Sequence, residues 1–138
     1  MASTTNDVRL EWTGRNLVFT AGNGRAPAIT IDGDSGEGPS PMDTVLLGVG
    51  ACMGADICHI LGKSRVPLEA LEVLVTGQRV ETNPRRYRAI RFVFRVKGPG
   101  PEDQAHVERA VALSRETYCS AIHSLRPDLE VDIAIERG

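Results

Sequence analysis

The sequence has 138 residues, of which 41% are hydrophobic and 25% are charged, and its formal net charge at pH 7 is −2. This length and composition are typical of one soluble globular domain, and we expect a single domain over residues 1–138. The acidic balance and an aromatic content of 4% argue against nucleic-acid binding, which favours basic surfaces and stacking side chains.

The N-terminus contains no charged segment followed by an apolar one, so we expect no secretory signal. The longest apolar stretch, around residues 45–61, contains Asp56 and His59, and we expect it to be too short and too polar to span a membrane. With three cysteines and no disulfide scaffold, the chain is expected to be cytoplasmic. In that compartment a disulfide is usually transient and either catalytic or redox-sensing.

The N-terminal third predicts short strands after a flexible start at residues 1–7. Glycines separate three segments in which apolar residues alternate with polar ones. These apolar residues are Val8, Leu10 and Trp12, then Leu17 and Phe19, then Ile29 and Ile31. A polar loop, DGDSGEGPS, follows them; it is no calcium loop, because Glu37 stands where such a loop requires glycine.

Residues 40–43 predict the start of a long helix. Ser40 is a suitable N-cap, Pro41 suits the first helical position, and Asp43 stands where a capping-box acid lies. We expect this helix to run to about Gly62 or Lys63 and to be buried, because its first two-thirds is almost wholly apolar. Each glycine inside it costs about 1 kcal/mol relative to alanine, so another helix or strand should approach closely there.

The remainder predicts a long antiparallel hairpin, a helix and a last strand. The hairpin comprises LEALEVLVTGQRVET and YRAIRFVFRVKG, turned at Asn83-Pro84, and its row of Arg91, Arg95 and Lys97 should face solvent. A helix is expected from about Glu102. Cys119 begins or continues a short helical piece, and LEVDIAIE closes the chain as an alternating strand.

Cys52 and Cys119 are the strongest candidates for reactive side chains in this sequence. Both lie in segments expected to be helical, and neither belongs to a CxxC pair, so the fold must bring them together if they act as partners. They are either small buried apolar residues or the attacking and resolving thiols of a thiol peroxidase. At about 100° per residue, Asp56 and His59 share the helix face of Cys52, whereas Cys58 points elsewhere and is expected to fill the core.

A nucleophilic Cys52 would need a cation or hydrogen-bond donors, because a thiol in an apolar helix is ordinarily unreactive. The sequence offers three arginines near the N-terminus for this role: Arg9, Arg15 and Arg25. We expect His59 to be structural or exposed and His123 to be exposed. Several residues are acceptable zinc ligands by type, but they form no compact ligand motif, and we expect no metal site. They are Cys52, Asp56, His59, Cys119 and His123.

Three segments occur in order at fitting spacing: SPMDTVLLGVGACMGADICHIL, the LEVLVTGQRVETNPRRYRAIRFVFRVKG hairpin, and VERAVALSRETYCSAIHSL before a final strand. Over about residues 8–137 the chain resembles the OsmC/Ohr family, the osmotically induced protein C and organic hydroperoxide resistance group. The resemblance implies an α+β fold in which curved antiparallel sheets wrap around two central helices. It also implies an intertwined homodimer with active sites at the subunit interface.

The same resemblance assigns roles to individual residues. Cys52 falls on the peroxidatic position and Cys119 on the resolving one. The peroxidase branches also use an arginine from the N-terminal region and a glutamate early in the central helix. Arg15 matches the arginine best; Met42 occupies the glutamate position, and Asp43 follows it as a possible partner of the arginine.

The leading hypothesis is a thiol-dependent peroxidase, an antioxidant oxidoreductase of the stress response that reduces organic hydroperoxides. The resemblance implies that an external dithiol reduces the resulting disulfide and that no cofactor or metal takes part. The alternative is a non-enzymatic dimer of the same fold that binds an apolar small molecule or senses redox state.

Overall fold

The computed structural model describes residues 4–138, which divide into two compact units, one ending at Val45 and the other comprising Leu46–Gly138. Residues 1–3 of the expected flexible start lie outside the described residues, and residues 4–7 belong to no helix or strand. The expectation of a single domain over residues 1–138 stays a prediction.

The N-terminal unit contains a three-stranded antiparallel sheet. Its strands are β1 (Arg9–Trp12), β2 (Val18–Gly22) and β3 (Ile29–Asp32), in the spatial order β1-β2-β3. The three strands expected from the alternating pattern are therefore confirmed. One face of this sheet is apolar and open: Leu10, Trp12 and Ile29 are each more than half exposed within the chain.

Helix α1 (Pro41–Lys63) begins and ends where the sequence predicts. The amide of Ser40 donates to the Asp43 carboxylate and the amide of Asp43 donates to Ser40 Oγ, both at 3.0 Å. These two reciprocal bonds are a capping box, which satisfies amide groups that would otherwise lack partners at the helix N-terminus.

The glycines of α1 allow a strand to approach the helix closely, as their cost in helix propensity led us to expect. A Cβ atom at Gly50 would lie 2.9 Å from Cγ2 of Val75, and one at Gly54 would lie 3.4 Å from Cγ2 of Val73. Both valines belong to β4 (Ala70–Arg79). The helix therefore packs directly on this strand.

The C-terminal unit has a mixed sheet in the order β4-β5-β6. Strand β5 (Tyr87–Lys97) pairs with β4 in antiparallel fashion and with β6 (Glu130–Arg137) in parallel. The mixed α+β class is confirmed, but the expectation of antiparallel sheets is wrong for β6. The chain returns to the start of β5 through α2 (Gln104–Leu113), and such a crossover produces a parallel pair.

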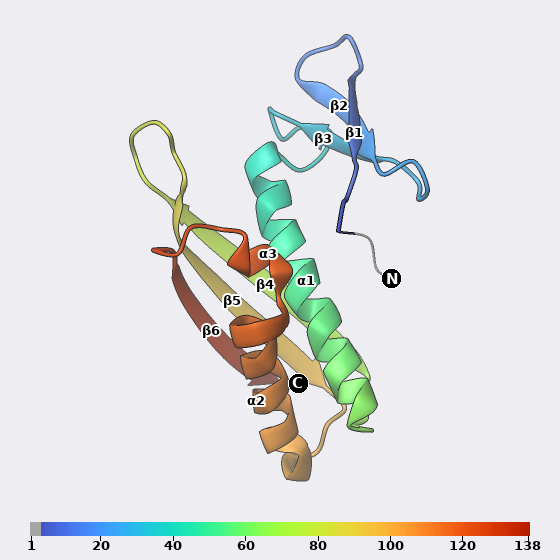
Figure 1. Cartoon of the computed structure of the whole chain (residues 1–138), viewed down its shortest axis with the longest axis vertical. Coiled ribbons are helices and arrows are strands. Elements are labelled where there is room, and N and C mark those ends of the chain that lie inside the picture. Colours follow the sequence, from blue (N-terminus) through green and yellow to red (C-terminus); the bar gives the residue numbers. More distant parts are fainter. Residues whose placement is uncertain (1–3) are drawn as a thin grey trace. The chain divides into compact units, whose positions relative to one another are not determined.

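Helices α1 and α2 lie over one face of this sheet, and the main core fills the space between (Figure 1). Alternate residues of β5 point into it, as their spacing predicts. The fully buried side chains of the core include Met53, Ile57 and Leu61 of α1, Phe92 and Phe94 of β5, and Val107 and Ala110 of α2.

Helix α1 is buried on one side only. Met53, Ile57 and Leu61 are fully enclosed, whereas Leu47 is 57% exposed. The expected burial of the helix is thus correct for the side that faces the sheet and wrong for the opposite side, where Leu47 is exposed among the described residues 4–138.

The same helix is long and apolar enough to cross a membrane, since its 23 residues contain a window of mean hydropathy 1.7. The expectation that this stretch is too short and too polar was therefore wrong on both counts. A helix that packs its apolar side into the core of a soluble protein has a similar composition, and α1 places six of its residues there.

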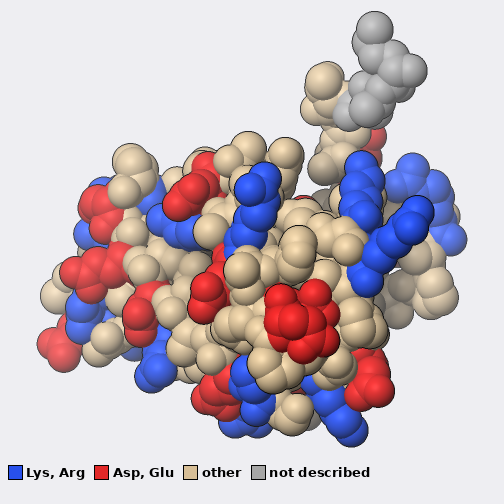
Figure 2. Space-filling view, turned by 90° about the horizontal axis from the view of Figure 1, so that it is seen from below, with Lys and Arg blue, Asp and Glu red and all other residues tan. Residues whose placement is uncertain are grey.

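The outer face of the C-terminal sheet carries paired charges. Arg95 of β5 donates to Glu72 of β4 at 2.9 Å and to Glu136 of β6 at 3.1 Å, and these hydrogen bonds raise the pKa of its guanidinium. The exposure of Arg95 and its two acidic partners agrees with the expectation that the arginine row is a solvated sheet face. On the side of the molecule that Figure 2 shows, seen from below, most acidic and basic side chains are intermingled.

Candidate thiol site

The two cysteines singled out in the sequence lie together at the packing of α1 against the C-terminal end of α2. Cys52, on α1, is partly buried and packs against the core, and Cys119 is completely buried within it. Cys52 lies near enough to Cys119 to contribute to the raised pKa of its thiol. Both are free thiols in this structure.

A wide turn brings Cys119 to this position. Helix α2 passes into the π-helical turn η2 (Ser114–Tyr118), which closes with a bond from the Cys119 amide to the Ser114 carbonyl at 2.8 Å. The chain then leaves the helical conformation at Cys119 and enters the short helix α3 (Ser120–His123). Such single π turns inside helices are frequent at functional sites, because they redirect one side chain.

Two opposing influences act on the Cys119 thiol. Burial and the neighbouring Cys52 raise its pKa, while the Ile122 amide, which donates to Cys119 Sγ at 3.4 Å, lowers it. Burial is the largest of these, and the pKa of Cys119 rises to about 11. Cys119 therefore carries its proton at neutral pH.

A partly buried hydrogen bond joins the two elements that carry the thiols. Ser114 is fully buried, and its hydroxyl donates to Oδ2 of Asp56 at 2.8 Å. Asp56 lies one turn beyond Cys52 on α1. Sequence reasoning placed Asp56 on the Cys52 face but did not single out Ser114, since a lone serine in a helix carries no distinctive signal.

The remaining residues considered as ligands or thiols lie outside this pair. Cys58 is exposed, so the expectation that it fills the core is wrong. His59 and His123 are exposed, as expected, and Nε2 of His123 is hydrogen-bonded to the Arg115 carbonyl at 3.1 Å. Among residues 4–138, no three histidine, cysteine or acidic side chains gather in a way that could hold a metal ion.

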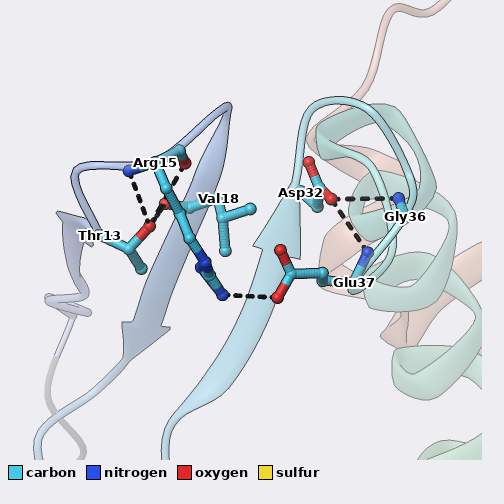
Figure 3. A network of polar contacts seen from close by, with 6 residues as sticks. All are labelled: Thr13, Arg15, Val18, Asp32, Gly36 and Glu37. Carbon is cyan, nitrogen blue, oxygen red and sulfur yellow. Dashed lines mark hydrogen bonds and ion pairs between the residues drawn. The ribbon is translucent and has the colours of Figure 1, made fainter.

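Arg15 belongs to the N-terminal unit, where it contacts Glu37. Its guanidinium Nη2 lies 2.5 Å from Glu37 Oε1, and both side chains are about half exposed (Figure 3). The turn that carries Arg15 is fixed by Thr13, whose hydroxyl donates to the Val18 carbonyl at 2.9 Å and accepts from the Arg15 amide at 3.4 Å.

The loop that carries Glu37 is organised by Asp32. This buried carboxylate accepts from the amide of Asp34 at 2.9 Å. It also accepts from the amides of Gly36 and Glu37, at 3.1 and 2.9 Å (Figure 3). The bonds from Asp34 and Glu37 are the main reason that the pKa of Asp32 is lowered. The loop that places Glu37 beside Arg15 is thus held by hydrogen bonds from its own amides to Asp32.

Asp43, expected from the resemblance to be a possible partner of Arg15, is engaged elsewhere. Its carboxylate accepts the Ser40 amide in the capping box at the start of α1. The carboxylate in contact with Arg15 is that of Glu37, which the sequence analysis considered only as a residue unsuited to a calcium loop.

Comparison with known proteins identifies the family. Residues 33–134 match the family described as OsmC-like protein. The chain belongs to this family. It is 36% identical over 129 residues to Protein YhfA of Escherichia coli (strain K12), an alignment that covers 93% of this chain and 95% of the relative.

Solved structures of other members have the same fold as this OsmC-like chain. A hypothetical protein from Aquifex aeolicus VF5 is 27% identical and superposes with a TM-score of 0.86, covering 99% of this chain and 98% of that one. An organic hydroperoxide resistance protein OsmC from Legionella pneumophila is 18% identical, with a TM-score of 0.69 and coverage of 99% of both chains. The expected OsmC-like fold is therefore confirmed.

The OsmC-like chain also has an apolar hollow in its N-terminal unit. It has a volume of about 360 Å³, within the range of small-molecule sites. Its lining is almost entirely apolar and comprises Leu10, Leu17, Phe19, Ile31, Gly33, Pro41 and Thr44.

Proposed function

We propose that this protein is a thiol-dependent peroxidase that reduces organic hydroperoxides. Membership of the OsmC-like family supports a peroxide-related stress function. The observation that carries the specific proposal is the pairing of a partly exposed Cys52 with a buried Cys119 whose side chains interact. Two thiols so arranged can complete a peroxide reduction without a metal or an organic cofactor.

The proposed reaction has two steps within the protein. The Cys52 sulfur attacks the terminal oxygen of ROOH, the O–O bond breaks, and the alcohol ROH leaves as Cys52 becomes a sulfenic acid. The Cys119 sulfur then attacks the Cys52 sulfur, and the S–O bond breaks to give a disulfide and water. An external dithiol returns the disulfide to two thiols by exchange.

The different surroundings of the two sulfurs support this division of roles. Cys52 is the partly exposed member, so a hydroperoxide can reach it, whereas Cys119 is fully enclosed. Because Cys119 holds its proton at neutral pH, it can supply that proton to the hydroxide that leaves the sulfenic acid. Cys119 therefore suits the resolving step better than the first attack.

We assign Arg15 to the stabilisation of the Cys52 thiolate, as the resemblance implies. Its contact with Glu37 supports this role, because a carboxylate that holds one side of a guanidinium limits the orientations of the other side. Glu37 would then act in place of the glutamate that the peroxidase branches carry at the position of Met42. Asp43, the alternative partner, is already used in the capping box.

We further propose that the protein acts as a cytoplasmic homodimer with its active sites at the subunit interface. Each compact unit leaves apolar side chains open that a second copy could cover: Trp12 is 61% exposed in the first unit and Leu47 is 57% exposed in the second. Light scattering on the purified protein tests this proposal, and a monomer at micromolar concentration would contradict it.

The decisive experiment treats the reduced protein with one equivalent of an alkyl hydroperoxide and maps the disulfides. A Cys52–Cys119 bond within one chain is expected at once. Cys52→Ser should abolish peroxide consumption, and Cys119→Ser should allow one turnover and leave a sulfenic acid. Cys58→Ser is the matched control and should retain full activity. Unchanged activity in Cys52→Ser would refute the proposal.

The apolar hollow of the N-terminal unit favours a second candidate, a non-enzymatic protein that binds an apolar small molecule. This candidate predicts that a neutral apolar probe binds with the same affinity to the wild type and to Cys52→Ser. It also predicts that Cys52 reacts with hydroperoxide no faster than the exposed Cys58. Preferential oxidation of Cys52 would decide for the peroxidase.

A further inference from the structure

Ser114 connects the two elements that carry the thiols. Its hydroxyl donates to Asp56 Oδ2 at 2.8 Å, and its carbonyl accepts from the Cys119 amide at 2.8 Å. The first bond reaches α1 one turn beyond Cys52, and the second closes the wide turn that ends at Cys119. One residue is therefore bonded both to the helix of one thiol and to the backbone of the other.

We propose that Ser114, through its bond to Asp56, is a positioning residue that holds the Cys119 sulfur where it can bond to Cys52. This inference rests on the proposed function and deepens it, since it concerns how readily the disulfide of that reaction forms. Ser114 touches neither a substrate nor the reacting atoms in this role; it acts through the placement of Cys119.

The surroundings of Ser114 explain why a hydroxyl stands there. Ser114 is completely buried, and its neighbours Ala110 and Val111 on α2 are core residues. A buried hydroxyl is unfavourable unless it is hydrogen-bonded, so an alanine would serve the core packing at least as well. The bond that compensates this cost is made to a carboxylate on the other helix, which is a strong and directional partner.

The geometry of a disulfide explains why such a bond would matter. The two Cα atoms must lie roughly 4.4–6.8 Å apart with a suitable torsion about the S–S bond, so a small slide between the elements prevents bonding. Apolar contacts between α1 and α2 are non-directional and resist such a slide weakly. The Ser114–Asp56 bond fixes the two elements beside the sulfurs.

The test measures disulfide formation without peroxide. In a buffer of reduced and oxidised glutathione, the Cys52 and Cys119 thiols give two electrons and two protons to oxidised glutathione, forming one disulfide and two molecules of reduced glutathione. At a known ratio of reduced to oxidised glutathione, the ratio of oxidised to reduced protein gives the effective concentration of the Cys119 thiol near the Cys52 thiol. Peptide mapping counts only the Cys52–Cys119 bond and so excludes the exposed Cys58.

Removal of either partner should lower this effective concentration. Ser114→Ala and Asp56→Ala should each reduce it about five- to tenfold, the equivalent of one hydrogen bond, and the double variant should fall no further. Asp56→Asn keeps a carbonyl oxygen that can accept from Ser114 and should remain within about twofold of the wild type. Loss of core stability alone would not produce this rescue.

Ser124→Ala is the matched control. Ser124 also lies near Cys119 in the sequence, and its hydroxyl donates to a carbonyl at 2.8 Å. That carbonyl belongs to Ser120 of α3, the helix that ends just before Ser124, so the bond does not reach α1. This variant should leave the effective concentration unchanged.

Two results would overturn the inference. One is an effective concentration within twofold of the wild type in both alanine variants, and the other is a fall in Asp56→Asn as large as that in Asp56→Ala. The proposed function fails separately: a wild type that forms the disulfide with glutathione but not with an alkyl hydroperoxide would refute the peroxidase and leave the role of Ser114 intact.

Discussion

The Arg15 guanidinium lies 2.5 Å from the carboxylate of Glu37. Glu37 lies before α1 in the chain rather than within it. The position early in α1 at which the resemblance expects a glutamate is occupied by Met42. A carboxylate is nevertheless available to the arginine. Asp32 accepts the Glu37 amide and so holds the loop between β3 and α1 with Glu37 directed toward Arg15. In this chain the carboxylate in contact with Arg15 is therefore that of Glu37.

This pairing predicts a graded effect on Cys52 oxidation. An ion pair of this exposure contributes about 0.2–1 kcal/mol, so Glu37→Gln should slow the reaction of Cys52 with an alkyl hydroperoxide by roughly 1.4- to fivefold. Arg15→Ala should slow it at least as much, and the double variant should be no slower than Arg15→Ala. Stopped-flow measurement of the oxidation rate tests this expectation. Glu81→Gln, at an exposed position of the hairpin turn, is the control; equal rates in Glu37→Gln and the control would contradict the role of Glu37.

Asp43 should behave differently from Glu37. Its removal breaks the bond that the Asp43 carboxylate accepts from the Ser40 amide, while the bond from the residue-43 amide to Ser40 Oγ remains. The loss of one such hydrogen bond costs about 0.5–1.5 kcal/mol of unfolding free energy. Asp43→Ala should therefore lower the midpoint of urea unfolding and leave the Cys52 oxidation rate unchanged. If the rate falls as far as in Arg15→Ala, Asp43 rather than Glu37 is the functional partner.

The start of α1 shows what the sequence specifies locally. Ser40, Pro41 and Asp43 form a capping signature that involves only neighbouring residues, and the structure contains it as expected. The period-two pattern of β5 fixed its buried face for the same reason. The expectation of antiparallel pairing was wrong for β6, because a strand's own pattern does not state in which direction it joins its neighbour.

The sequence predicted those site residues whose type has few roles in proteins. It did not predict those whose type is common. Cysteine at positions 52 and 119 is chemically distinctive, so the pair could be named before its contact was known. Ser114 and Glu37 are common residue types whose importance comes from partners 58 and 22 residues away. Only the fold reveals such bonds, since no local pattern encodes them.

The packing of α1 on β4 predicts opposite effects of alanine at two glycines. A Cβ atom at Gly50 would meet Val75 Cγ2 at 2.9 Å, whereas one at Gly62 has no neighbour within 4 Å. Gly50→Ala should lower the unfolding free energy by about 1–2 kcal/mol, because overpacking exceeds the gain in helix propensity. Gly62→Ala should raise it by up to about 1 kcal/mol. Urea unfolding compares the two, and a stabilised Gly50→Ala would contradict the close approach.

The raised pKa of Cys119 predicts a loss of stability in alkaline solution. Its pKa is about 11 in the folded protein against an ordinary value of 9.0, so the folded state holds this proton more tightly than the unfolded state. The resulting stabilisation is complete below pH 9 and declines as pH rises from 9 through 11. The difference in unfolding free energy between the wild type and Cys119→Ala, measured in a reducing buffer, should therefore narrow over this range.

The same comparison with Cys58→Ala is the control for an exposed thiol. A difference for Cys119→Ala that stays constant from pH 8 to 11 would mean that the thiol is not enclosed, and it would remove the reason for giving Cys119 the proton-bearing, resolving role.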